Sequence, residues 1–244
     1  MNENKTAAVV IIGDEILSGR TKDSNAGFIA ERLSLRGLHL KVIITIPDDL
    51  EKIIDTVNLY RKTYDFVFTC GGIGATPDDL TREALAKAFG KRCQRNIEAA
   101  KQLENYYKER INDLRLRMAD LPEDCVLIPN ATSGAPGFRL ENVYVFPGVP
   151  KLMREMFLSI EKELPQGKIF KTEVKSPIGE TLFADLMEEA LKKFPDVKIG
   201  SYPELDEVSG SWQCKLTFTA GSEKAVLEAQ TFLMSAIEKR ASGN

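Results

Sequence analysis

The residues best suited to chemistry lie between positions 67 and 83, where a short apolar run meets a glycine-rich loop and a pair of acids. The loop and its acids comprise Gly71, Gly72, Ile73, Gly74, Asp78 and Asp79. Glycines have no Cβ atom that would keep backbone amides away from an anion, and the helix expected after them directs unpaired amides at the same point. The two carboxylates would repel phosphate unless a cation lay between them. The segment therefore predicts a phosphate site completed by a divalent metal ion.

A structural role for Asp79 competes with this interpretation. Thr76 with Asp79 three residues later resembles a capping box, and Pro77 would occupy the first helical position, which proline favours. On spacing alone, Asp79 fits a helix cap as well as it fits a metal ligand. The helix itself is predicted over residues 80–89, with Gly90 ending it.

The elements around the loop alternate between apolar strands and amphipathic helices. Strands are predicted at residues 7–12, 38–46, 66–69 and 143–146, and helices from residue 24, around residues 53–59, at residues 80–89 and from Pro150. This order is typical of βαβ units and predicts an α/β fold whose mainly parallel sheet is covered on both faces, in three layers. Ligands of such sheets bind beyond the carboxyl ends of the strands. Four segments meet that condition, namely residues 13–25, 47–49, 71–79 and 147–150.

Bulk composition is that of a soluble globular protein. The 244 residues are 43% apolar and 28% charged, and 33 basic against 36 acidic residues give a net charge of −3. This balance predicts neither a nucleic-acid partner nor a membrane partner. No apolar run approaches the roughly 20 residues that span a bilayer, and the first five residues lack the core of a secretion signal, so we expect a cytoplasmic protein.

Histidine and cysteine chemistry is nearly excluded. His39 is the single histidine and alternates with apolar neighbours as on a strand surface. The four cysteines are Cys70, Cys93, Cys125 and Cys214, too scattered to predict a zinc or redox site. Acid, base and ligand roles therefore fall to Asp, Glu, Lys and Ser.

The remaining sequence predicts a long polar helix at residues 96–117, a nine-residue loop at residues 129–137 and a hinge at residues 164–167. The small side chains and exposed amides of that loop suit a flat ligand. Beyond the hinge, strands at 169–174, 197–201 and 212–219 and helices at 180–194 and 222–239 predict a small α+β domain. We expect residues 1–165 to form the ligand-binding domain and residues 168–244 to support it or mediate oligomerisation.

Six motifs, in order, resemble the molybdopterin-binding-like domain of the CinA family, which also forms the N-terminal half of eukaryotic FAD synthases. They lie at residues 13–19, 23–25, 48–49, 71–81, 135–138 and 147–150. The later residues are similar to the small domain that follows in CinA proteins. One departure is Ala75, which stands where CinA proteins usually have proline. The sequence ends at Asn244 without room for the amidohydrolase domain of CinA-type proteins, so the resemblance does not extend to deamidation.

The resemblance implies a metal-dependent nucleotide pyrophosphatase acting on a substrate such as ADP-ribose or FAD, and a homo-oligomer. It places Asp48 and Asp79, with Asp78 beside them, as catalytic residues and as ligands of Mg²⁺, Mn²⁺ or Co²⁺, with K⁺ as a further cofactor candidate. Two alternatives remain open. One is a protein that binds or adenylates molybdopterin, and the other is a scaffold that binds a nucleotide or pterin without catalysis.

The same segments supply the candidates for binding the substrate. These are Gly13, Asp14, Glu15, Gly19, Asp23, Asn25, Gly71, Gly72, Ile73, Gly74, Thr76, Thr81, Ser133, Gly134, Pro136, Gly137, Pro147, Gly148 and Pro150. Asp14 and Glu15 are also candidates for a metal ligand or a general base.

Overall fold

The computed structural model describes residues 5–205 and 212–243. The chain divides into two compact units, residues 1–166 and residues 167–244, and each is described by itself. Within the described ranges, no helix has both the length and the apolar character needed to cross a membrane.

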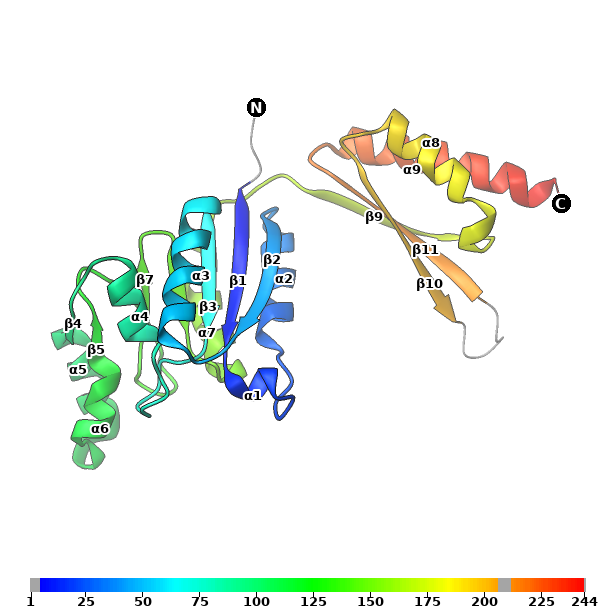
Figure 1. Ribbon diagram of the computed structural model, residues 1–244. Helices are drawn as coiled ribbons and strands as arrows, with labels where there is room; N and C mark the ends of the chain where they lie inside the picture. Colours follow the sequence, from blue (N-terminus) through cyan, green and yellow to red (C-terminus); the bar gives the residue numbers. More distant parts are fainter. Residues whose placement is uncertain (1–4, 206–211, 244) are drawn as a thin grey trace. The chain divides into compact units, whose positions relative to one another are not determined.

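The first unit is built on a six-stranded sheet in the order β2-β1-β3-β8-β7-β6 (Figure 1). The strands are β1 (Thr6–Ile12), β2 (His39–Ile46), β3 (Phe66–Cys70), β6 (Val126–Ile128), β7 (Gly137–Leu140) and β8 (Val143–Phe146). Strands β2, β1, β3 and β8 are parallel to their neighbours, whereas β7 is antiparallel to both β8 and β6. The predicted α/β fold with a mainly parallel sheet is confirmed.

Helices cover both faces of this sheet (Figure 1). On one face, α3 (Leu50–Thr63) and α4 (Thr81–Ala88) pack against Ala8, Val10 and Ile12 of β1. On the other face, α2 (Asn25–Leu35) and α7 (Pro150–Ile160) pack against Ala7, Val9 and Ile11. Alternate residues of β1 thus enter two different cores, which explains why the strand is apolar without interruption.

The segment between α4 and β8 differs most from the prediction. It contains β4 (Cys93–Arg95), α5 (Ile97–Tyr107), the 3₁₀ turn η1 (Lys108–Arg110), α6 (Asp113–Leu116), the 3₁₀ turn η2 (Arg117–Ala119) and β5 (Asp120–Pro122). The single helix predicted over residues 96–117 was wrong. Lys108 adopts a φ of +51° and ends α5, and the side chain of Asn112 accepts a hydrogen bond from the Arg115 amide to start α6.

The second unit is the predicted small α+β domain. Its elements are β9 (Phe170–Ser176), the 3₁₀ turn η4 (Glu180–Leu182), α8 (Ala184–Lys193), β10 (Lys198–Leu205), β11 (Trp212–Ala220) and α9 (Glu223–Ser242). The strands form an antiparallel sheet in the order β10-β11-β9. Leu216 and Phe218 of β11 are buried in one core with Val226 and Leu233 of α9. The helix predicted from residue 180 begins at Ala184, after the 3₁₀ turn.

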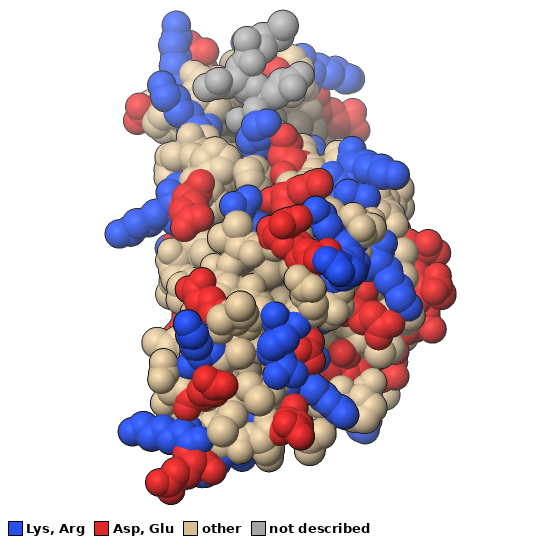
Figure 2. Space-filling view, turned by 90° about the vertical axis from the view of Figure 1, so that its left-hand side faces the viewer, with Lys and Arg blue, Asp and Glu red and all other residues tan. Residues whose placement is uncertain are grey.

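Acidic and basic side chains are mixed on one face of the molecule. Figure 2 shows acidic and basic side chains interspersed on the face that it presents, without a continuous area of one sign. Ion pairs such as Arg92 with Glu123 and Arg95 with Asp120 join opposite charges on neighbouring strands and turns. This face therefore offers no extended basic surface.

Candidate functional site

The glycine loop begins where β3 ends, between β1 and α4. Gly71 has a φ of +114°, and a Cβ atom built on it would lie 2.0 Å from the carbonyl oxygen of Ile12 in β1. Gly72 has a φ of +67°, and its Cβ would lie 2.2 Å from Oγ1 of Thr81. Both positions combine a backbone conformation that favours glycine with a close approach that any side chain would block.

The first turn of α4 and the side chains on it bind four successive carbonyl groups of the loop. The acceptors are the carbonyl oxygens of Gly71, Gly72, Ile73 and Gly74. Thr81 donates from Oγ1 to the first at 2.9 Å and from its amide to the second at 3.0 Å. Nη1 of Arg82 donates to the other two. Arg82 has no local sequence pattern that marks it for this role.

Because N–H and C=O point in opposite directions across a trans peptide, gathering these carbonyls turns the intervening amides away from α4. The amides of Gly72 and Ile73 make no hydrogen bond to an acceptor in the described chain. Both residues line the cleft at this end of the sheet. The two amides are therefore available to an anion in the cleft.

The Asp79 side chain accepts hydrogen bonds from other residues of its own loop. Its Oδ1 accepts from the Gly74 amide at 2.7 Å, and its Oδ2 accepts from the Thr76 amide at 2.9 Å and from the Thr76 hydroxyl. Helix α4 begins only at Thr81, with Leu80 as its N-cap residue. The Asp79 carboxylate accepts from the Thr76 amide, as the acid of a capping box does, but α4 begins at Thr81, so Asp79 caps no helix start and Pro77 does not occupy a first helical position.

We expect Asp79→Ala to raise the KM or Kd for a phosphate-bearing ligand about tenfold, since three hydrogen bonds that shape the loop are lost. The free energy of unfolding should fall by only about 1 kcal/mol, because the site is at the surface. Titration with a nucleotide and urea denaturation measure the two effects. Glu83→Ala, an exposed acid in the first turn of α4, is the control. An Asp79→Ala protein that binds as tightly as this control would contradict the role.

Asp48 and the glycine loop face each other. Asp48 follows β2, its Oδ2 accepts from the Asp14 amide at 3.0 Å, and its Oδ1 lies 3.5 Å from the position of a Cβ on Gly72. Burial raises the pKa of Asp48, as do the charges of Glu15, Asp14 and Asp78, while the hydrogen bond from Asp14 lowers it. The neighbouring Asp49 instead caps α3, accepting from the Lys52 amide at 2.8 Å.

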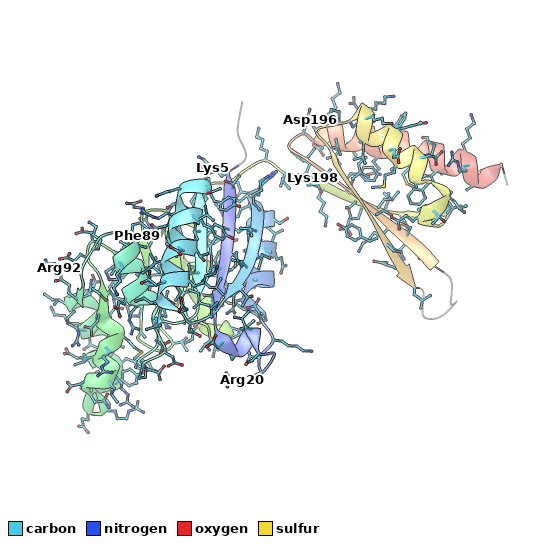
Figure 3. The ribbon with its side chains drawn as sticks, in the orientation of Figure 1. Lys5, Arg20, Phe89, Arg92, Asp196 and Lys198 are labelled. Atoms are coloured by element: carbon cyan, nitrogen blue, oxygen red, sulfur yellow. The ribbon has the colours of Figure 1, made fainter. Side chains whose placement is uncertain are left out.

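These groups line a cleft of about 530 Å³. The lining residues are Ile12, Glu15, Thr21, Asp48, Gly71, Gly72, Ile73, Gly74, Asp78, Asp79, Met118, Asn130, Ser133, Ala135, Pro147, Gly148, Val149, Pro150 and Leu152. Among these described residues are four acids and neither lysine nor arginine. Arg20, labelled beside α1 (Asp14–Leu17) in Figure 3, donates to Ser18 and is outside the lining.

The structure thus brings together twelve of the predicted site residues: Glu15, Asp48, Gly71, Gly72, Ile73, Gly74, Asp78, Asp79, Ser133, Pro147, Gly148 and Pro150. Asp23 and Asn25 line an adjoining pocket of about 50 Å³ that shares Glu15, Gly148 and Pro150 with the cleft. Nδ2 of Asn25 donates to the Gly148 carbonyl at 2.8 Å, and this bond ties the start of α2 to the turn before α7.

Other predicted site residues lie outside the cleft lining, namely Gly13, Asp14, Gly19, Thr76, Thr81, Gly134, Pro136 and Gly137. Several have packing roles. A Cβ on Gly13 would lie 2.7 Å from Oε1 of Glu15, and one on Gly134 would lie 2.6 Å from Cβ of Tyr106. Residues that the sequence did not single out include Thr21, Met118 and Leu152, which have no local pattern to mark them.

The carboxylates do not form a preassembled metal site. In the described ranges, no group of three or more His, Cys, Asp or Glu side chains is arranged to hold a metal ion. Asp79 is engaged by the loop, whereas Oδ1 of Asp48 accepts no hydrogen bond within the described chain. Mg²⁺ at phosphate sites takes one or two protein carboxylates and completes its shell with phosphate oxygens and water. Glu15, Asp48 and Asp78 are the remaining carboxylates of the cleft lining that could hold such an ion.

The first unit has three layers and a cleft at the carboxyl ends of its parallel strands, and both features agree with the class of protein that the sequence comparisons identify. Residues 8–166 match the family model described as "Probable molybdopterin binding domain", and residues 168–243 match "FAD synthase, middle domain". The chain belongs to the family of the first model, as the CinA-like resemblance predicted.

Relatives and a solved structure agree with this assignment. A protein from Archaeoglobus fulgidus is 36% identical over 80% of this chain and 85% of its own length. A probable FAD synthase from Caenorhabditis elegans is 33% identical over 96% of this chain but only 50% of its own length. The crystal structure of CinA from Thermoplasma acidophilum is similar with a TM-score of 0.62, 33% identity and coverage of 66% of this chain and 98% of that one.

Proposed function

We propose that this protein is a metal-dependent hydrolase of nucleotide pyrophosphates of the ADP-ribose or FAD type. One observation carries the proposal: free loop amides, which suit a phosphate, share a cleft with four carboxylates and no basic side chain among the described lining residues. Such a lining has no positively charged side chain to neutralise an anionic diphosphate. The diphosphate would therefore bind together with a divalent cation. The cleft volume lies within the range of small-molecule sites.

In the mechanism that we infer, the amides of Gly72 and Ile73 hold one phosphate and stabilise charge that develops on it. Oδ1 of Asp48, beside Gly72 and oriented by the Asp14 amide, accepts a proton from the attacking water, and its raised pKa suits that role. The water oxygen bonds to phosphorus as the bridging P–O bond breaks, and the second phosphate leaves with the electron pair. A bound divalent ion would supply neutralising charge and acidify water.

A second candidate is a protein that binds or adenylates molybdopterin. It is favoured by the match of residues 8–166 to a family described as a probable molybdopterin binding domain. The same amides and acids would serve, because a transferase and a hydrolase differ in whether a substrate group or water attacks phosphorus.

The test is incubation of the purified protein with ADP-ribose or FAD, and separately with ATP and molybdopterin. Each is run with Mg²⁺, Mn²⁺ or Co²⁺, with and without K⁺, and the products are separated by chromatography. AMP with ribose 5-phosphate or FMN supports the hydrolase. An adenylated pterin supports the second candidate, and binding without turnover supports a non-catalytic scaffold. Either of these last two outcomes, with no hydrolysis under any metal, overturns the hydrolase.

A further inference from the structure

Arg82 is a buried cation directly behind the glycine loop. Its side chain lies in the first turn of α4, the residue is 8% exposed, and it is outside the lining of the cleft, so it does not reach a ligand there. Nη1 donates to the carbonyl oxygens of Ile73 and Gly74. Burial lowers the pKa of the guanidinium and the charge of Asp79 opposes that effect. The group keeps its charge, because a guanidinium remains protonated throughout the physiological pH range even when burial lowers its pKa.

Thr81 holds the first two peptide planes of the loop through the Gly71 and Gly72 carbonyls, and Arg82 holds the next two. Gly74 has no Cβ to restrain the planes on either side of it, and two adjacent carbonyls turned the same way repel each other. A rotation here would turn the Ile73 or Gly74 carbonyl oxygen toward the anion. One guanidinium that binds both oxygens favours the arrangement with both carbonyls behind the loop, and it adds positive charge on that side.

Asp79 acts on the same peptide from the opposite end. The plane between Ile73 and Gly74 donates its N–H to Oδ1 of Asp79 and accepts from Arg82 through its C=O. Opposite charges therefore hold the two ends of one peptide group. The next plane toward the cleft, between Gly72 and Ile73, carries the free Ile73 amide and is held by the Thr81 amide.

We propose that Arg82 is a positioning residue for diphosphate binding. Thr81 holds the two peptide groups that carry the Gly72 and Ile73 amides, whereas Arg82 holds the next two through the Ile73 and Gly74 carbonyls, and so fixes the backbone of Ile73 from which the Ile73 amide is directed at the phosphate. The inference rests on the proposed use of this loop for phosphate. It does not require that the bound diphosphate be hydrolysed. Loss of the guanidinium should weaken ligands that carry phosphate and leave the rest of the cleft unchanged.

The test compares Arg82→Met, Arg82→Lys and a matched control, Arg61→Met. Arg61 also binds α4, but at the opposite end, where it donates to the Ala88 carbonyl at 3.0 Å and lies over the ring of Phe89, which is labelled in Figure 3. Titration calorimetry measures the Kd of ADP-ribose with Mg²⁺ and the Kd of adenosine. NMR follows the amide resonances of Gly72 and Ile73 during addition of magnesium pyrophosphate.

For Arg82→Met we expect the Kd of ADP-ribose to rise 10- to 100-fold and that of adenosine to change less than twofold. The pyrophosphate-induced shifts of Gly72 and Ile73 should be lost. Arg82→Lys should recover part of the affinity, because lysine restores the charge but not the planar donor, and Arg61→Met should match the wild type. Equal losses for both ligands, or wild-type amide shifts in Arg82→Met, overturn the inference. Wild-type protein that binds these ligands without cleaving them overturns the hydrolase and leaves this role of Arg82 intact.

Discussion

Asp48→Asn is expected to lower kcat/KM for a nucleotide pyrophosphate by at least about 100-fold, because the substitution removes the proton acceptor and one negative charge facing a metal-bound diphosphate. Asparagine keeps the shape and can still accept from the Asp14 amide, so the fold should be retained. Steady-state kinetics at several Mg²⁺ concentrations measure the loss. Asp49→Asn is the matched control, since Asp49 caps α3 and lies outside the cleft lining.

The same variant should gain stability, and the gain should depend on pH. Burial raises the pKa of Asp48 above its ordinary value of 3.8, so ionising this carboxyl costs more in the folded state than in the unfolded state. The cost is absent below the unfolded pKa and is complete above the folded pKa. The thermal midpoint of Asp48→Asn should therefore exceed that of the wild type at neutral pH, and the two should converge below pH 3.8. If Asp48→Asn had the same kcat/KM and the same thermal midpoints as the wild type, Asp48 would have no role in the site.

Gly71→Ala is expected to cost roughly 3–5 kcal/mol of unfolding free energy, the sum of a strained backbone and a clash with main chain. The added Cβ would meet the Ile12 carbonyl at 2.0 Å, and neither β1 nor β3 can move without breaking the sheet. Gly19→Ala is the control. Gly19 also has a positive φ, +74°, but a Cβ there meets nothing within 4 Å, so we expect a loss of about 1–2 kcal/mol.

Urea denaturation of the two glycine variants gives the comparison directly. If they lose the same free energy, then the close approach of Gly71 to β1 contributes nothing, and backbone conformation alone explains the need for glycine. A Gly71→Ala protein that remains folded should also have lost phosphate affinity, because the loop can relieve the clash only by shifting away from Ile12, which displaces the neighbouring Gly72 and Ile73 amides.

Local patterns in the sequence were enough to place β1, β3 and β8, which are short apolar runs as expected for buried parallel strands, and to place the half-buried edge strand β2 from its alternation of polar and apolar residues. They were not enough to place the start of α4. Thr76, Pro77 and Asp79 have the spacing of a helix start, but the Asp79 carboxylate binds the amides of Gly74 and Thr76. Which amides the Asp79 carboxylate binds depends on the backbone path of the whole loop.

Two further features of the site depend on contacts that spacing does not encode. Asp48 and Asp49 are adjacent, and only the fold distinguishes the one that faces Gly72 from the one that caps α3. The strands β4, β5 and β6 have three residues each, too few to show a period of two. Met118 reaches the cleft from this segment without any pattern that predicts it.

Strands β3 and β8 are hydrogen-bonded neighbours, although a long segment of chain separates them in the sequence. Of residues 91–136, only Met118, Asn130, Ser133 and Ala135 line the cleft, whereas the groups proposed to bind phosphate lie on segments that follow β1, β2 and β3. Residues 91–136 therefore contribute to the cleft lining without supplying the groups proposed to bind phosphate. A graft of residues 91–136 should alter which ring system the protein accepts, while the anchoring of the diphosphate stays the same.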